Sequence, residues 1–158
     1  MERTTPPIPT DLDRRTPATV ERSVELDLDV AAALDAVVRP ELLSAWLGPW
    51  STSGDGATVV TDDGVTRVVS DVARSGDGVR WSWAPAGGGT TSEVTITVSP
   101  LDDGRSRVTV REVRAASGDA GAGAQDAGVA LDGLGWAICL LALEIAAAAR
   151  TLAVVGAA

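Results

Sequence analysis

The sequence has no histidine, lysine, asparagine, phenylalanine or tyrosine, and it contains a single cysteine and a single methionine. Without histidine it lacks the commonest general base, the commonest metal ligand and the usual partner of a nucleophilic serine or cysteine. These absences disfavour catalytic triads and transition-metal sites, so we expect no metal and no cofactor. The five tryptophans are the only aromatic residues, and any aromatic contact depends on them.

Basic charge is also scarce. Thirteen arginines stand against 22 aspartates and glutamates, which gives a formal net charge of −9 at pH 7. A chain of this charge is repelled by a phosphate backbone and by an anionic membrane surface. We therefore expect no nucleic-acid partner.

The one cysteine, Cys139, lies in an apolar helical run, a setting typical of a small core residue rather than a reactive thiol. No disulfide is available within the chain. The first residues are acids and prolines, unlike the basic start and apolar core of a secretory signal, which favours a cytoplasmic protein. The uninterrupted apolar run near the C-terminus is short and rich in alanine, so we expect no membrane span.

A length of 158 residues fits one domain. Residues 1–18 combine four prolines with polar side chains and are predicted to be a flexible leader. Residues 19–155 are predicted to form the single domain, interrupted by a Gly/Ala-rich loop over residues 115–130. The glycines of that loop do not match a phosphate-binding pattern.

Apolar and polar residues alternate from Thr19 to Val30, which predicts a half-buried strand. Asp29 is placed to cap a short helix that ends near Val38. Pro40 suits the first position of a second short helix, which the Gly48-Pro49 pair ends. The apolar face of that second helix turns Trp46 inward, whereas Trp50 lies beyond it and is expected only to fix the following loop to the sheet.

A β-meander follows, because short β-branched runs alternate with Asp-Gly and Gly-rich turns. Its strands are predicted over residues 57–61, 65–73, 79–84, 91–100 and 105–114. The paired acids at positions 62–63 and 102–103 each precede a turn glycine, so we interpret them as turn formers rather than catalytic carboxylates. One long helix, over residues 131–153, completes the chain.

This order of elements is that of the helix-grip α+β fold, in which a curved antiparallel sheet of about six strands wraps a long C-terminal helix and two short helices follow the first strand. The likeness is carried by four stretches: residues 39–49 (RPELLSAWLGP), residues 79–83 (VRWSW), residues 107–112 (RVTVRE), and Gly135-Trp136 with Leu140 and Leu143. With these stretches the chain resembles the SRPBCC (START-like) superfamily, and within it the small bacterial proteins related to the activator of heat-shock protein 90 ATPase. The resemblance implies a cavity between the sheet and the last helix.

Strand alternation and helix spacing give a set of side chains that should face this cavity, which we predict to be ligand-binding: Trp46, Arg67, Val69, Trp81, Trp83, Ile96, Val110, Glu112, Trp136, Leu140 and Leu143. Any single tryptophan is adequately explained as a core residue. The convergence of four of them favours a lined pocket, because such pockets combine apolar walls with a few polar groups.

Glu112 is the most informative polar candidate, since alternation places it on the inner side with Val108 and Val110. A carboxylate buried there needs a partner or a raised pKa. Arg67 and Asp71, which alternation puts on one strand face with Val69, are the candidate partners. The alternative is that Glu112 lies near the strand end at the cavity mouth and is solvated.

Three hypotheses of function follow. The first is binding of an apolar or amphipathic small molecule without catalysis. The second is a co-chaperone-like or regulatory interaction module, supported by a C-terminal helix that is apolar nearly all round and is also a candidate homodimer contact. The third, drawn from superfamily relatives that are polyketide cyclases, is an enzyme that uses Glu112 or Asp71 as its acid or base.

Overall fold

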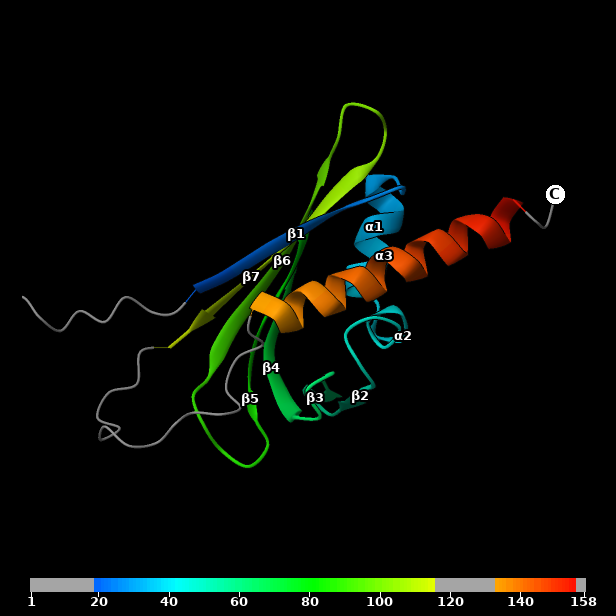
Figure 1. The fold of residues 1–158 in the computed structure, drawn as a ribbon. Coiled ribbons are helices and arrows are strands. Elements are labelled where there is room, and N and C mark those ends of the chain that lie inside the picture. The colour runs from blue at the N-terminus through cyan, green and yellow to red at the C-terminus, as the bar shows by residue number, and fades with distance from the viewer. Residues whose placement is uncertain (1–18, 116–132, 156–158) are drawn as a thin grey trace, which may run out of the picture.

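The computed structural model describes residues 19–115 and 133–155. The predicted leader and almost all of the predicted Gly/Ala-rich loop lie outside the described residues. The elements, in chain order, are β1 (Thr19–Leu26), α1 (Val30–Val38), α2 (Pro40–Leu43), β2 (Trp50–Ser53), β3 (Gly56–Val60), β4 (Thr66–Ser75), β5 (Gly78–Pro85), β6 (Ser92–Pro100), β7 (Ser106–Arg114) and α3 (Gly133–Val155). The strands form one antiparallel sheet in the order β1-β7-β6-β5-β4-β3-β2 (Figure 1).

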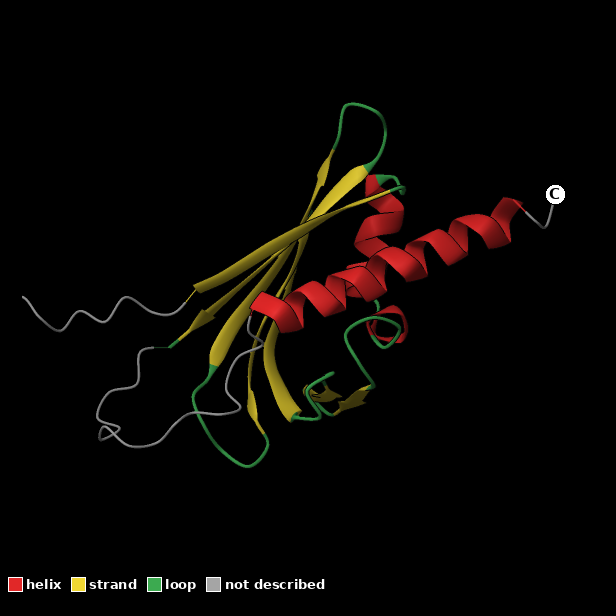
Figure 2. Ribbon diagram, viewed as in Figure 1, coloured by secondary structure: helices red, strands yellow, loops and turns green. Residues whose placement is uncertain are grey.

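The helices lie together on one side of this curved sheet (Figure 2). Helix α3 packs against β1, and α1 packs against β5, β6 and β7. This arrangement confirms the helix-grip α+β fold. The expected sheet of about six strands gains a seventh, β2, a four-residue edge strand that pairs Trp50 with Val59 of β3.

The two short helices begin where the sequence predicts. The Asp29 carboxylate accepts a hydrogen bond of 2.8 Å from the backbone N–H of Ala32 and so caps α1. Pro40 occupies the first turn of α2. Gly48 then turns the chain toward β2 with a φ of 134°, and a Cβ at this position would lie 2.0 Å from the carbonyl oxygen of Val60. Only glycine satisfies both the backbone angle and this close approach.

A β-bulge changes the phase of β4 in mid-strand. Val69 pairs with Trp83, but after the irregularity Arg74 pairs with Val79, so two residues of β4 stand opposite Trp81. The first of them, Asp71, has a φ of 55° and is exposed. The prediction that Asp71 shares a face with Arg67 and Val69 is therefore wrong, because strict alternation does not survive an inserted residue.

The inner face of α3 buries Trp136, Cys139, Leu140, Leu143 and Ala147. Its outer face leaves four large apolar side chains exposed, namely Leu134, Ile138, Leu141 and Ile145. Homodimerisation through this helix stays a prediction. Sedimentation or light scattering measures the oligomeric state directly. In the described part of the chain, no helix is long and apolar enough to cross a membrane.

Candidate functional site

Four tryptophans form a continuous row of ring contacts through the interior, which we call the tryptophan row: Trp50, Trp81, Trp83 and Trp136. The ring centroids of Trp50 and Trp81 are 5.6 Å apart and those of Trp81 and Trp83 are 6.0 Å apart, both in edge-to-face geometry. Trp83 stacks on Trp136 at 5.7 Å with an interplanar angle of 19°. These are favoured aromatic geometries, so the row ties β2 and β5 to α3.

Glu112 lies at the inner end of the row and is 1% exposed. Its Oε1 accepts a hydrogen bond of 2.9 Å from Nε1 of Trp83, and its Oε2 accepts one of 2.7 Å from Nε1 of Trp136. The alternative of a solvated Glu112 is thus excluded. The prediction that Arg67 or Asp71 is the partner of Glu112 is wrong, because two indole N–H groups donate to the carboxylate instead.

Arg67 is fully buried, and its guanidinium carbon lies 5.0 Å from the ring centroid of Trp83, within cation–π range. Its two terminal nitrogens donate to the Asp63 carboxylate at 3.0 and 2.8 Å, and Nη1 also donates to the Thr61 hydroxyl. Asp63 is therefore more than a turn former. Burial acts to raise its pKa, but hydrogen bonds from Thr61, Arg67 and the Val65 backbone outweigh burial and hold the pKa below its ordinary value.

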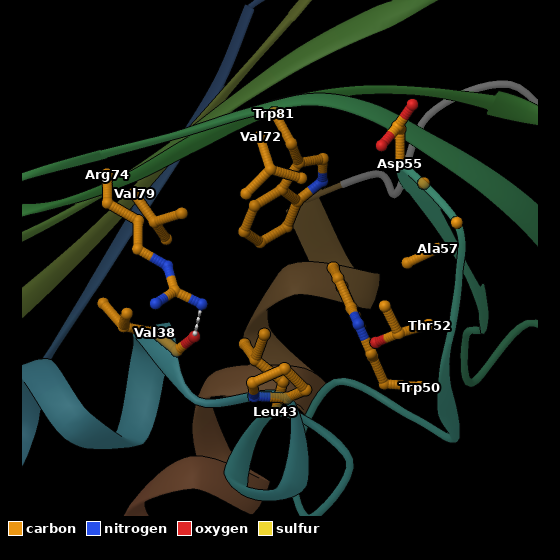
Figure 3. A pocket seen from close by; sticks show the side chains of 13 residues that line it. Val38, Leu43, Trp50, Thr52, Asp55, Ala57, Val72, Arg74, Val79 and Trp81 are labelled. Carbon is orange, nitrogen blue, oxygen red and sulfur yellow. Dashed lines mark hydrogen bonds between the residues drawn. The ribbon is translucent and has the colours of Figure 1, made fainter.

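A pocket of about 190 Å³ opens at the outer end of the row, beside Trp50 and Trp81 (Figure 3). Its walls come from three places: the α1–α2 junction, the β2–β3 hairpin, and the part of β4 and β5 around the bulge. The lining is mostly apolar, with two charged residues, Asp55 and Arg74. Its residues are Val38, Pro40, Leu43, Trp50, Thr52, Gly54, Asp55, Gly56, Ala57, Val72, Arg74, Val79 and Trp81.

Among the predicted ligand-binding residues, Trp81 lines this pocket. Trp83, Trp136, Glu112 and Arg67 are packed behind it in the buried network just described, and Val69, Ile96, Val110, Leu140 and Leu143 belong to the surrounding core. The space expected between the tryptophans is thus occupied by their own rings and by Glu112. The pocket beside Trp50 and Trp81 lies between the sheet and the short helices.

Trp46 faces another way. Its indole N–H donates to the carbonyl oxygen of Ala36 at 3.0 Å, and the ring borders a second hollow of about 370 Å³, which is enclosed by the α2–β2 connection, the end of β3 and α3. Cys139 lines the same hollow and is 1% exposed. Burial raises the pKa of its thiol to about 11, so it is a poor nucleophile at neutral pH.

Sequence reasoning missed every pocket residue except Trp81, among them Trp50, Thr52, Val72 and Arg74. The bulge brings Val72 and Arg74 to the inner side of the sheet. In the short edge strand β2, Trp50 and Thr52 face the pocket. Two polar features stand out in the lining. Arg74 makes one long hydrogen bond, 3.4 Å to the carbonyl oxygen of Val38. The buried indole N–H of Trp81 has no acceptor within the described ranges.

No group of three or more metal-ligating side chains occurs among the residues that the structure describes. The site is therefore characterised by apolar walls, tryptophan edges, one arginine and one aspartate, Asp55. Together, fold and site define a helix-grip protein with a small apolar pocket next to a buried Trp–Glu–Arg network.

Solved structures share this fold at low sequence identity. DynU16, a protein of the dynemicin biosynthetic locus, matches with a TM-score of 0.61 and 21% identity over 80% of this chain but only 45% of its own length. A conserved protein from Geobacillus kaustophilus matches with a TM-score of 0.61, 16% identity and coverage of 83% and 95% of the two chains. CalU16 from Micromonospora echinospora matches with a TM-score of 0.55, 16% identity and coverage of 82% and 83%.

These likenesses show the helix-grip fold alone, because every identity is below 25%, and the SRPBCC superfamily that the sequence resembles stays a prediction. No protein-family model and no curated protein matches the chain. The narrower resemblance to the heat-shock protein 90 ATPase activator relatives accordingly stays a prediction.

Proposed function

We propose that the protein binds an apolar or amphipathic small molecule in the pocket beside Trp50 and Trp81. The observation that carries the proposal is the pocket itself: about 190 Å³ of space walled by two tryptophans and aliphatic side chains, with few polar groups. Ligand sites typically have this composition. An apolar ligand gains free energy here by displacing water from tryptophan and leucine surface.

The volume limits the ligand. An engineered apolar cavity of about 150 Å³ accommodates benzene, so a pocket of about 190 Å³ holds one ring with a short substituent, or a branched chain of similar size. A multi-ring polyketide does not fit unless the β2–β3 hairpin moves. The dynemicin locus from which DynU16 comes gives a small-molecule setting for a protein of this fold, which supports the proposal without naming a ligand.

Catalysis has less support from the geometry. Both oxygens of Glu112 accept hydrogen bonds from indoles in the core, and Asp71 is exposed on the bulge. Neither carboxylate lines the pocket. Binding without an acid–base step is therefore the function that this arrangement fits best.

The five indole N–H groups provide a direct test, since each gives its own signal in a ¹H–¹⁵N NMR spectrum and Trp→Phe variants assign them. Titration with 4-methylphenol is expected to shift the signals of Trp50 and Trp81, because both rings line the pocket. The Trp46 signal should not shift, because its N–H donates a hydrogen bond to the carbonyl oxygen of Ala36, away from the pocket. A titration that moves no indole signal, or moves only that of Trp46, contradicts the proposal.

A further inference from the structure

We propose that the preferred ligand is a small monocarboxylate, with its apolar part against Trp50 and Trp81 and its carboxylate paired with Arg74. The inference rests on the proposed binding function and specifies the chemical class of the ligand. It depends on three observations: the direction in which the bulge turns Arg74, the free hydrogen-bonding capacity of its guanidinium, and the position of the neighbouring charges.

The bulge decides where Arg74 points. Counting by twos from Val69, Arg74 belongs on the outer face of the sheet. The two β4 residues opposite Trp81 reverse that phase, and Arg74 pairs with Val79, which lines the pocket. Ala73 pairs with Arg80, which is exposed and absent from the pocket walls. An insertion that re-aims one side chain is a recurrent use of bulges beside functional sites.

The Arg74 guanidinium has hydrogen-bond donors that are available to a ligand. It offers five N–H donors in a planar fork, and one of its terminal nitrogens contacts the Val38 carbonyl at the C-terminal end of α1. Within residues 19–115 and 133–149, no carboxylate forms an ion pair with it. By contrast Arg67 is paired with Asp63, and Arg107 with Glu25. A ligand carboxylate is the group that matches these available N–H donors, because its two oxygens can accept two parallel hydrogen bonds from a guanidinium.

The second charged residue in the lining does not compete for Arg74. Figure 3 shows Arg74 reaching from β4 toward Val38 on one side of the opening, with Trp50 on the other. The Asp55 carboxylate lies on the far side and points away from the pocket centre. The apolar floor between Arg74 and the two tryptophans, formed by Leu43 and Val79, suits a ring or a branched chain that joins the two ends.

Matched ligands and matched variants test the inference. The ligands are 3-phenylpropanoate and its neutral amide, 3-phenylpropanamide, and binding is followed through the Trp50 and Trp81 indole signals. We expect the wild-type protein to bind the carboxylate about tenfold more tightly than the amide, the size of a partly exposed charge-assisted pair. Arg74→Gln should abolish that preference and Arg74→Lys should retain part of it. Arg80→Gln, the same charge change on the outer face, should leave the preference intact.

The outcomes separate the two proposals. If the amide and the carboxylate bind equally well to the wild-type protein, or if Arg74→Gln keeps the preference, the carboxylate inference is overturned while pocket binding stands. If neither ligand nor 4-methylphenol moves the Trp50 and Trp81 signals, pocket binding fails and the inference fails with it. Thermal unfolding of each variant confirms that it is folded.

Discussion

The indole of Trp83 donates a hydrogen bond of 2.9 Å to the carboxylate of Glu112, across the hydrophobic core. The second carboxylate oxygen accepts from Trp136 on α3. One buried acid therefore joins β5, β7 and α3. Glu112 is buried and does not line the pocket, so it is not placed for acid–base chemistry on a ligand there.

Glu112→Gln is expected to lower the free energy of unfolding by about 1–3 kcal/mol, because an amide has one acceptor oxygen and its NH₂ group would face an indole donor. Urea denaturation followed by circular dichroism measures the change. Glu93→Gln is the matched control, since Glu93 is exposed on β6 and should tolerate the change within about 0.5 kcal/mol. Equal stability of wild type and Glu112→Gln would mean that the paired carboxylate does not hold α3 in place.

Gly76 in the β4–β5 turn and Gly78 at the start of β5 should respond differently to alanine. A Cβ on Gly78 would lie 1.9 Å from the carbonyl oxygen of Ile96, whereas one on Gly76 meets nothing within 4 Å. Gly78→Ala must push β5 away from β6 and is expected to cost at least about 2 kcal/mol. Gly76→Ala should change stability by less than about 1 kcal/mol. Thermal unfolding of both variants checks the contrast, and similar melting temperatures would contradict the close approach of these strands.

The Asp63–Arg67 pair predicts an acid-sensitive contribution to stability. Because the folded-state pKa of Asp63 lies below its ordinary value of 3.8, the contribution is complete above that value and is lost as the pH falls through the lower folded-state pKa. Asp63→Asn also leaves the buried Arg67 unpaired, so we expect it to be about 2 kcal/mol less stable at pH 7. The difference from wild type should shrink in strong acid.

Urea unfolding at a series of pH values from neutral to strongly acidic measures this difference. Asp62→Asn is the control, because Asp62 is the exposed neighbour in the same turn. A stability gap between wild type and Asp63→Asn that is constant over the whole pH range would show that the charge of Asp63 does not support Arg67.

Cys139 should be nearly inert in the folded protein. With its pKa raised to about 11 by burial, only about one thiol in a thousand is ionised at pH 8. We expect iodoacetamide to label it at least about 100-fold more slowly in buffer than in concentrated urea. Mass spectrometry over time gives both rates, and rapid labelling of the folded protein would contradict the close packing of α3 against the sheet.

Local chemistry made much of the fold predictable. The Asp29 cap, the Pro40 start and the hairpin turns depend on residues within a few positions of one another. Regular alternation likewise placed Trp81, Trp83 and Glu112 on the inner side of the sheet. These features required no knowledge of how distant segments meet.

The pocket was harder to predict because it depends on departures from regularity. Strict alternation placed Asp71 inward, but one inserted residue in β4 leaves Asp71 exposed and brings Arg74 into the pocket lining. Trp50 was expected only to fix a loop to the sheet, because it lies beyond the Gly48-Pro49 pair, whereas it begins the short strand β2. The partners of Glu112 come from β5 and α3, and their meeting depends on how α3 packs on the sheet, which no local pattern encodes.

Filling the pocket tests the central claim most directly. Thr52 is exposed and its side chain lines the pocket from β2, whereas the adjacent Ser51 is exposed and does not. Thr52→Trp should fill the space and weaken binding of 4-methylphenol, measured by calorimetry, by at least about tenfold. Ser51→Trp should bind it as the wild-type protein does. Unchanged affinity in Thr52→Trp, or equal losses in both variants, would contradict a binding site beside Trp50 and Trp81.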